Sequence, residues 1–304
     1  MENNKPLVSF WIPVYNHEKY IKECVEAALA QTYSPLEIVI SDDCSTDRSF
    51  DIIKETVANY SGPHKIVLNR NPFNLGIGAH QNKKKELVHG EFITGCAGDD
   101  VALPNKVEVM VERWLKSERK NHLLFSNAII IDGDGNESGL YFKNPPRYSA
   151  TLSEFINDKR SRLSKILEPS VWVLGATSGS SRDIWESFDD INPKVMQEDA
   201  VSSFRSLLLG GMDYIDEPLI KYRVHSASVS SKTNYKSVSR LLSREYYYVK
   251  QQIADSHKIG APKIILWELR KNQAVALVKR LVFQIPFINV KIVSIIKNWN
   301  SSRK

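Results

Sequence analysis

Two pairs of adjacent aspartates, each placed where an apolar run ends, constrain the fold of this chain more than any other feature. The pair Asp42-Asp43 follows the run 37–41, and the pair Asp99-Asp100 follows the stretch 91–98. Adjacent carboxylates repel each other and suit strands poorly, so a cation or a ligand hydroxyl explains them better than folding does. In open α/β sheets, ligands bind at the carboxyl ends of the strands. The pairs therefore predict a site for a nucleotide and a divalent metal at that edge.

Short apolar runs alternate with helical patterns through the first hundred residues. The expected strands are 7–12, 37–41, 65–69 and 91–94, and the expected helices are 18–31, 49–59 and a segment that follows the loop 74–78 and ends near residue 88. Such a β-α-β-α-β-α-β order implies a mainly parallel sheet with helices on both faces.

The second half of the chain has weaker patterns. They predict helices at 104–116 and 198–209, strands at 123–131 and 171–177, a loop with a helix at 139–162, and a linker at 226–236. We therefore expect an α/β domain over residues 1–232 and a basic, mostly helical extension over residues 233–304.

The net charge of +6 is spread unevenly. Residues 241–304 hold 12 Lys and Arg against 3 Asp and Glu, a balance of +9, which leaves −3 for residues 1–240. The apolar segment 281–296 is interrupted by Pro286 and Lys291, which suits helices lying on an anionic membrane surface better than a span. No N-terminal signal region and no cysteine framework are apparent, so we expect a cytoplasmic protein, peripheral on the inner face of the cell membrane.

A series of short motifs follows in order along the chain. They are Pro13-Val14-Tyr15-Asn16, Gln31-Thr32-Tyr33, Ser41-Asp42-Asp43-Cys44-Ser45-Thr46-Asp47, Asn74-Leu75-Gly76, Asn82, Gly90-Glu91-Phe92-Ile93, Asp99-Asp100, Glu198-Asp199 and Tyr222-Arg223-Val224-His225. In this order the chain resembles glycosyltransferase family 2 over roughly residues 7–232. The resemblance implies the GT-A fold, a Rossmann-like sheet flanked by helices, and an inverting transfer of a sugar from a nucleotide sugar. Cys44 stands where the family usually has glycine.

The resemblance also implies how the donor is held. The nucleotide-sugar-binding residues expected from it are Pro13, Val14, Tyr15, Asn16, Asp43, Asn74, Gly76, Asn82, Asp99 and Arg223. Asp43 is expected at the edge of a uracil base, and Asp99 near the ribose. Asp100 and His225 are the expected ligands of Mn²⁺ or Mg²⁺, which would neutralise the diphosphate as it leaves. Many relatives carry a further carboxylate that would fall at Ala97, so the division of labour between Asp99 and Asp100 stays open.

The acceptor hydroxyl must lose a proton as it attacks the anomeric carbon, and a carboxylate can take that proton. The resemblance assigns this role to Asp199, with Glu198 beside it. The basic tail then favours a lipid-linked saccharide acceptor, carried on a polyprenyl pyrophosphate, as in assembly of bacterial O-antigen or capsule. A soluble glycan or a protein is the alternative acceptor.

Other interpretations fit parts of the sequence. Asp42-Asp43 and Glu198-Asp199 also suit helix N-termini, and Lys83-Lys84-Lys85 suits a solvated helix face better than a phosphate site. A nucleic-acid-binding role lacks a recognition motif, and the acidic body disfavours it. A nucleotidyltransferase would show a Gly-rich phosphate loop where residues 13–17 stand. A non-catalytic, nucleotide-sugar-binding homologue remains the second alternative.

Overall fold

A computed structural model describes residues 5–143, 173–225 and 235–283. The elements in chain order are β1 (Val8–Val14), α1 (Ile21–Leu29), β2 (Leu36–Asp42), α2 (Ser49–Val57), β3 (Lys65–Arg70), α3 (Ile77–Leu87), β4 (Phe92–Gly95), β5 (Val101–Ala102), α4 (Lys106–Lys116), β6 (Leu123–Ile131), β7 (Glu137–Leu140), η1 (Gly175–Thr177), β8 (Ser178–Ser181), α7 (Asp183–Glu186), α8 (Glu198–Leu209), β9 (Met212–Arg223), α9 (Tyr235–Lys258) and α10 (Lys263–Phe283). The α/β class expected from the alternating patterns is confirmed.

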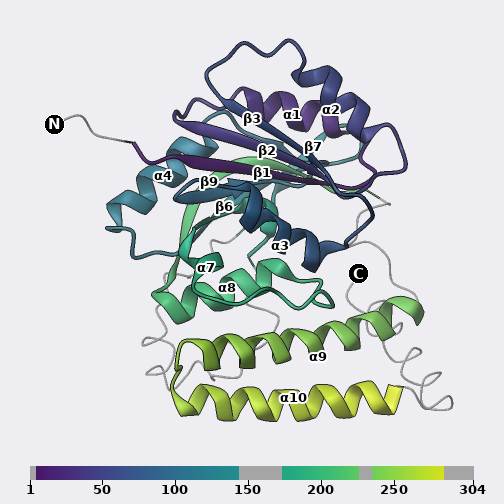
Figure 1. The fold of residues 1–304 in the computed structure, drawn as a ribbon, viewed down its shortest axis with the longest axis vertical. Coiled ribbons are helices and arrows are strands. Elements are labelled where there is room, and N and C mark those ends of the chain that lie inside the picture. The colour runs from purple at the N-terminus through teal and green to yellow at the C-terminus, as the bar shows by residue number, and fades with distance from the viewer. Residues whose placement is uncertain (1–4, 144–172, 226–234, 284–304) are drawn as a thin grey trace.

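The first half of the sheet is the parallel sheet that the sequence predicts. Strands run in the order β3-β2-β1-β4, with β1 parallel to both of its neighbours. Side chains of β1 alternate between the two faces, so that Phe10 packs in one core and Trp11 in the other. Because the strands are parallel, their carboxyl ends lie along one edge, where residues 13–16, 42–43 and 95–100 follow them (Figure 1).

The second half of the sheet is mixed. It continues β8-β6-β9-β5, where β8 is antiparallel to β4 and to β6, while β9 is parallel to β6. The strand expected at 171–177 is wrong over its described part, because Gly175–Thr177 forms a 3₁₀ turn in which the Thr177 N–H bonds to the Leu174 carbonyl. The strand begins one residue later, at Ser178. The expected segment 139–162 falls largely outside the described residues.

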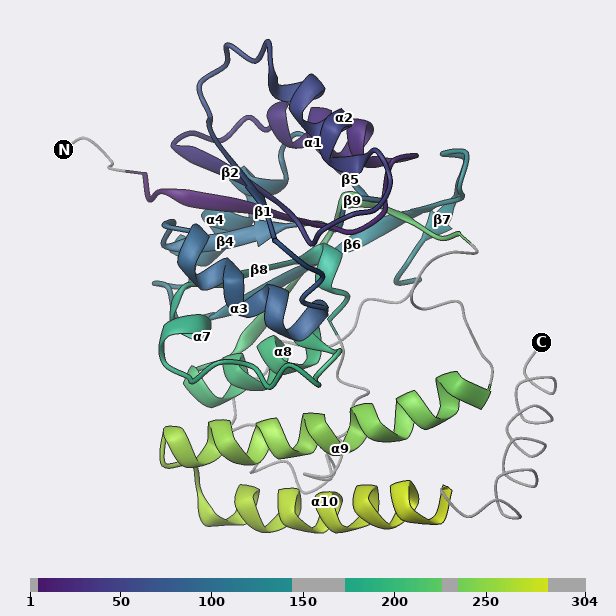
Figure 2. The same cartoon turned by 45° about the vertical axis from the view of Figure 1, so that its right-hand side comes forward.

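Helices cover both faces of the sheet (Figure 2). Helices α1, α2 and α4 pack on one face, with the buried side chains of Ile21, Ile53 and Met110 in a common apolar core. The opposite face packs against α7 and α8 through Trp185 and Val201. Helix α8 therefore lies close to the sheet, with its N-terminus toward the edge where the acidic pairs stand.

The helical C-terminal extension is confirmed, and it packs against the body of the protein. Helices α9 and α10 lie antiparallel beneath α8, as the views in Figures 1 and 2 agree. The Arg205 guanidinium of α8 forms two hydrogen bonds, of 2.8 and 3.0 Å, with the Asp255 carboxylate of α9, and both side chains are buried. Within the described residues no helix has the length and apolarity needed to cross a membrane. The apolar run after Phe283 lies outside the described residues.

Candidate active site

The carboxylate of Asp43 organises the nucleotide end of the predicted site. Its Oδ1 accepts hydrogen bonds from Asn71 Nδ2 at 2.8 Å and from the Leu75 N–H at 2.9 Å, and its Oδ2 accepts the Gly76 N–H at 2.9 Å. Gly76 has φ +76°, a left-handed conformation that glycine adopts without strain. Asp43 thus fixes the loop that precedes α3, and it remains a predicted base-binding residue.

The neighbouring Asp42 has a structural role. Its Oδ2 accepts the Ser45 N–H at 3.0 Å and lies 3.3 Å from Arg70 Nε, and its side chain is fully buried. Cys44, which follows Asp43, has φ +61°. The position where the family usually has glycine therefore has a backbone conformation that favours glycine. Helix capping is left to Asp47, whose Oδ1 accepts the Ser49 N–H at 2.9 Å. Helix capping therefore does not account for the acidic pair.

The segment after β1 lies beside this loop. Val14 is buried, and its carbonyl accepts the Asp43 N–H at 2.8 Å. Asn16, with φ +57°, accepts the Thr46 N–H on its side-chain oxygen at 2.8 Å. Tyr15 is 45% exposed, so its ring is available to a ligand, and Pro13 lines the pocket described below.

The pair Asp99-Asp100 divides into an accessible and a buried carboxylate. Asp99 Oδ2 lies 3.1 Å from His225 Nε2, and both side chains are partly exposed. Asp100 is 1% exposed, and its Oδ1 accepts the Arg223 N–H at 2.9 Å. Burial raises the pKa of Asp100 well above its usual range, with a further contribution from the Asp99 carboxylate. The two aspartates therefore have different surroundings although they are adjacent in sequence.

Arg223 is expected to hold donor phosphates, but its side chain is used within the protein. Nε donates to the Asp99 carbonyl at 2.8 Å, one terminal nitrogen donates to the Asp132 carbonyl at 3.2 Å, and the other pairs with Glu23. The side chain is 2% exposed, and the guanidinium lies over the ring of Tyr20. In these surroundings Arg223 positions the loop that carries Asp99 and Asp100.

The side chains beside Asp99 fit a divalent cation that protein and substrate hold together. Within residues 5–143, 173–225 and 235–283, no three His, Cys, Asp or Glu side chains form a complete metal site. One carboxylate and one imidazole, Asp99 and His225, do converge. Mn²⁺ accepts both ligand types, and Mg²⁺ is commonly held by one or two protein groups together with substrate phosphates. His17 lies nearby, its buried Nδ1 has no hydrogen-bond partner in the part of the chain that the structure describes, and burial lowers the pKa of His17.

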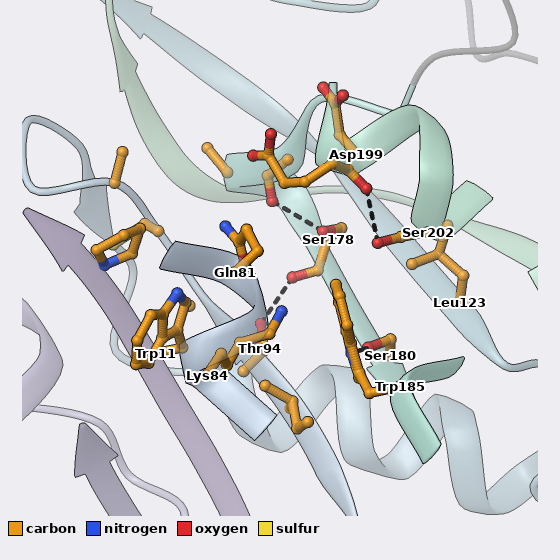
Figure 3. A pocket seen from close by; sticks show the side chains of 18 residues that line it. Trp11, Gln81, Lys84, Thr94, Leu123, Ser178, Ser180, Trp185, Asp199 and Ser202 are labelled. Atoms are coloured by element: carbon orange, nitrogen blue, oxygen red, sulfur yellow. Dashed lines mark hydrogen bonds between the residues drawn. The ribbon is translucent and has the colours of Figure 1, made fainter. Parts of the chain in front are cut away.

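Asp199 borders a pocket of about 130 Å³ between the sheet edge and the N-terminus of α8 (Figure 3). The segment Gly95–Ala97, which leads to Asp99, forms another part of its wall. Asp199 Oδ1 accepts the Ala200 N–H at 2.8 Å, in the first turn of α8, where the helix dipole favours a negative charge. The structure therefore brings the predicted base and the segment that leads to Asp99 to the same pocket.

Lys84 lines this pocket, and the expectation of a solvated helix face is wrong for it. Its side chain is 6% exposed, and Nζ lies 3.3 Å from the centroid of the Trp185 ring. The flanking lysines are paired at the surface, Lys83 with Glu86 and Lys85 with Asp190. Burial of Lys84 depends on Trp185, about a hundred residues away, so no local pattern indicates it.

Two of the expected asparagines differ in their surroundings. Asn82 exchanges hydrogen bonds with the Ile191 backbone, at 2.7 Å to its carbonyl and 2.8 Å from its N–H. Its amide thereby attaches α3 to the loop before α8. Asn74 is exposed at the tip of the loop that Asp43 holds. Its position leaves it accessible to a nucleotide.

The sequence is similar to known glycosyltransferases. A family model described as Glycosyl transferase family 2 matches residues 9–163. A chondroitin synthase of Escherichia coli is 38% identical over 131 residues, which are 43% of this chain and 18% of that protein. An uncharacterized glycosyltransferase of Rickettsia typhi is 34% identical over 238 residues, covering 74% of this chain and 66% of the relative. A putative colanic acid biosynthesis glycosyl transferase of Escherichia coli K12 is 33% identical, covering 44% and 46%. The chain thus spans less than two thirds of the length of these relatives.

Solved structures with the same fold extend the likeness over most of the chain. Staphylococcus aureus TarS 1–349 in complex with UDP-GlcNAc has a TM-score of 0.58 at 18% identity, covering 87% of this chain and 72% of that one. A mannosyltransferase of Pyrobaculum calidifontis in complex with GDP-Man and Mn²⁺ has a TM-score of 0.54 at 17% identity, covering 96% and 80%. These similarities confirm the expected GT-A fold.

Proposed function

Since this chain belongs to glycosyl transferase family 2, we propose that it transfers a sugar from a nucleotide sugar to a saccharide hydroxyl with inversion at the anomeric carbon. One observation carries the proposal: Asp199 and the segment leading to Asp99 border the same pocket. A base on one side of a sugar and a diphosphate site on the other are the two parts that direct displacement needs.

The residues divide the work as follows. The loop fixed by Asp43, together with the exposed ring of Tyr15, binds the nucleoside. Asp199 takes the proton of the attacking hydroxyl, and its place in the first turn of α8 stabilises the carboxylate form that a base requires. Attack from the Asp199 side on an α-linked donor yields a β-linked product.

We further infer that Asp99 and His225, rather than Asp100, hold the divalent cation. Asp99 Oδ2 and His225 Nε2 lie 3.1 Å apart with partly exposed side chains, whereas the Asp100 carboxylate is buried against the Arg223 N–H. When bound, Mn²⁺ or Mg²⁺ would neutralise charge on the departing diphosphate. Arg223 contributes by holding the Asp99 carbonyl in place.

Paired substitutions test this assignment. Asp99→Asn is expected to weaken Mn²⁺-dependent donor binding at least about tenfold, because a neutral amide is a poorer ligand for a hard cation. Asp100→Asn keeps an acceptor for the Arg223 N–H and is expected to leave that affinity within about threefold of wild type. Titration calorimetry with Mn²⁺ and UDP measures both. A loss confined to Asp100→Asn would reverse the assignment.

The donor is proposed to be a UDP-sugar and the acceptor a lipid-linked saccharide of a surface polysaccharide, such as O-antigen or capsule. Relatives named for chondroitin and colanic acid synthesis, and a fold neighbour solved with UDP-GlcNAc, support this class. The alternative acceptor is a soluble glycan or a protein. Measuring hydrolysis of a panel of UDP- and GDP-sugars with Mn²⁺ and with Mg²⁺ tests the donor, and no turnover or binding of any donor would contradict the function.

A surface on α10 favours docking on an anionic membrane, with residues 233–304 as the associating extension. Helix α10 packs inward through Ile265, Leu269 and Ala276. Most of its exposed apolar side chains lie on the other side of the helix. The exposed set is Ile264, Trp267, Val275, Leu277, Val278 and Leu281. Lys271 lies over the Trp267 ring, and Lys263 and Arg270 are exposed on the same part of the helix. An apolar strip bordered by cations is typical of helices that lie in a membrane interface.

Substitution of this strip gives a sharper test than removal of the whole extension, because α9 contributes buried contacts to α8. Changing Trp267, Val275, Val278 and Leu281 to serine is expected to weaken binding to phosphatidylglycerol vesicles about tenfold or more. Leu115→Ser, at an exposed apolar residue of α4, is the matched control. Unchanged vesicle sedimentation of the fourfold variant would contradict the membrane proposal.

A further inference from the structure

We propose that Lys84 makes the pocket beside Asp199 selective for a sugar that bears a carboxylate, so that the sugar transferred is an acidic one of the uronate class. The inference rests on the proposed function, because it takes this pocket to hold the sugar being transferred. It adds a substrate class and assigns it to one side chain of α3.

The position of the pocket identifies which sugar would enter it. The anomeric carbon of the donor is bonded to the diphosphate and is attacked from the opposite side, so the transferred ring must lie between the two groups. The pocket is bordered by Gly95–Ala97 on the diphosphate side and by Asp199 on the other. With a volume of about 130 Å³ it is smaller than the roughly 300–1,000 Å³ of typical ligand pockets, which suits a single ring.

The ammonium group of Lys84 forms no ion pair with a carboxylate of the described residues. It lies on the Trp185 ring. In the described part of the chain, no acceptor forms a hydrogen bond with Nζ, and no carboxylate lies within 4.0 Å of it. Burial lowers the pKa of Lys84 to about 7, against the opposing effect of the more distant Glu198. A buried ammonium is stable when its three N–H donors find acceptors, and here the pocket is the open side.

A second buried lysine has hydrogen-bond acceptors within the protein and serves as a comparison. Lys106 is fully buried, but its Nζ donates to the Gly95 carbonyl at 2.5 Å and to the Ala176 carbonyl at 2.6 Å. These two carbonyls belong to residues that line the same pocket from behind. The protein thus supplies acceptors for Lys106, whereas Lys84 lines the pocket and its donors are available to a ligand.

Gln81, one helical turn before Lys84, supplies a second unpaired atom. Its side chain is 8% exposed, it lines the pocket, and its Oε1 is buried without a hydrogen-bond partner among the described residues. Figure 3 shows Gln81 and Lys84 directed toward the space below Asp199. A uronate supplies both missing partners, because its carboxylate accepts from Nζ while a ring hydroxyl donates to Oε1. A neutral hexose leaves the charge of Lys84 without a counter-ion.

Two donors that differ only at C6 give the direct test. For the full-length protein with Mn²⁺, kcat/KM for transfer or hydrolysis of UDP-glucuronate is expected to exceed that of UDP-glucose. Lys84→Met should lower the value for UDP-glucuronate about 10- to 100-fold, the effect of losing one charge-assisted hydrogen bond, and leave UDP-glucose within about threefold. The galacturonate and galactose pair, together with UDP-N-acetylglucosamine, completes the panel, and Lys84→Arg should retain part of the preference.

Controls separate this inference from folding and from the proposed function. Lys83→Met removes a surface lysine of the same helix and should not alter the donor preference. Binding of UDP alone should be equal in wild type and Lys84→Met, which establishes that the variant is folded. Preference for a neutral or an N-acetylated sugar, unchanged in Lys84→Met, would overturn the inference and leave the transferase function intact. No turnover of any donor would overturn both.

Discussion

Asp199→Asn is expected to lower kcat about 10²- to 10⁴-fold while leaving the affinity for the nucleotide unchanged. The amide cannot take a proton at neutral pH, so the acceptor hydroxyl would have to attack without a base. Asn keeps the size of the side chain and an oxygen acceptor for the Ala200 N–H, which Asp199 Oδ1 now accepts at 2.8 Å. The start of α8 should therefore be preserved, and the loss should fall on the chemical step.

Measurement of turnover and of UDP binding on the same preparations separates chemistry from binding. Glu198→Gln tests the adjacent acid, which also lines the pocket, and is expected to cause a smaller loss than Asp199→Asn. Asp190→Asn, at an exposed carboxylate that pairs with Lys85, is the surface control. Turnover by Asp199→Asn at the wild-type rate would remove Asp199 from the base role.

The parallel half of the sheet is predictable from the sequence because its signals are local. Strands such as β1 and β2 are continuous apolar runs, and the helices between them have their own periodic patterns. The long strand β9 was not predicted. Charged residues at 213, 216 and 217 and Pro218 interrupt its pattern, and its pairing with β6 shifts register near that proline. Its place in the sheet is set by the partner strand.

In the candidate site, too, some features are predictable from local sequence and others depend on tertiary contacts. Asp43, Asp99 and Asp199 stand in motifs, and the fold places the first two after strands of the sheet and the third in the first turn of α8. Asp100 accepts the Arg223 N–H, and the Arg223 side chain donates to the Asp99 carbonyl. These residues are more than a hundred positions apart, so their burial depends on tertiary structure. Lys84 shows the dependence on tertiary structure most clearly. A run of three lysines predicts a solvent-exposed face, but the ring of Trp185 lies against the Lys84 ammonium.

Asp255→Ala is expected to lower the free energy of unfolding by about 3–5 kcal/mol, because it leaves the Arg205 guanidinium buried without its counter-charge. Arg205 and Asp255 are 1% and 2% exposed in their side chains and form two hydrogen bonds. Gln251 also loses its bond to Asp255 Oδ1, at 2.9 Å. Because the pair joins α8 to α9, the loss should also loosen the helix that carries Asp199, and chemical denaturation measures its size.

Two comparisons decide whether burial of the ion pair is responsible. Asp189→Ala removes an exposed pair with Lys258, also between the body and α9, and should cost far less than Asp255→Ala because solvent screens an exposed pair. The double variant Arg205→Met/Asp255→Leu removes both charges and should recover most of the stability lost in Asp255→Ala, because apolar replacement of a whole buried pair is often neutral or better. Equal losses in Asp189→Ala and Asp255→Ala would show that the interface tolerates an unpaired arginine.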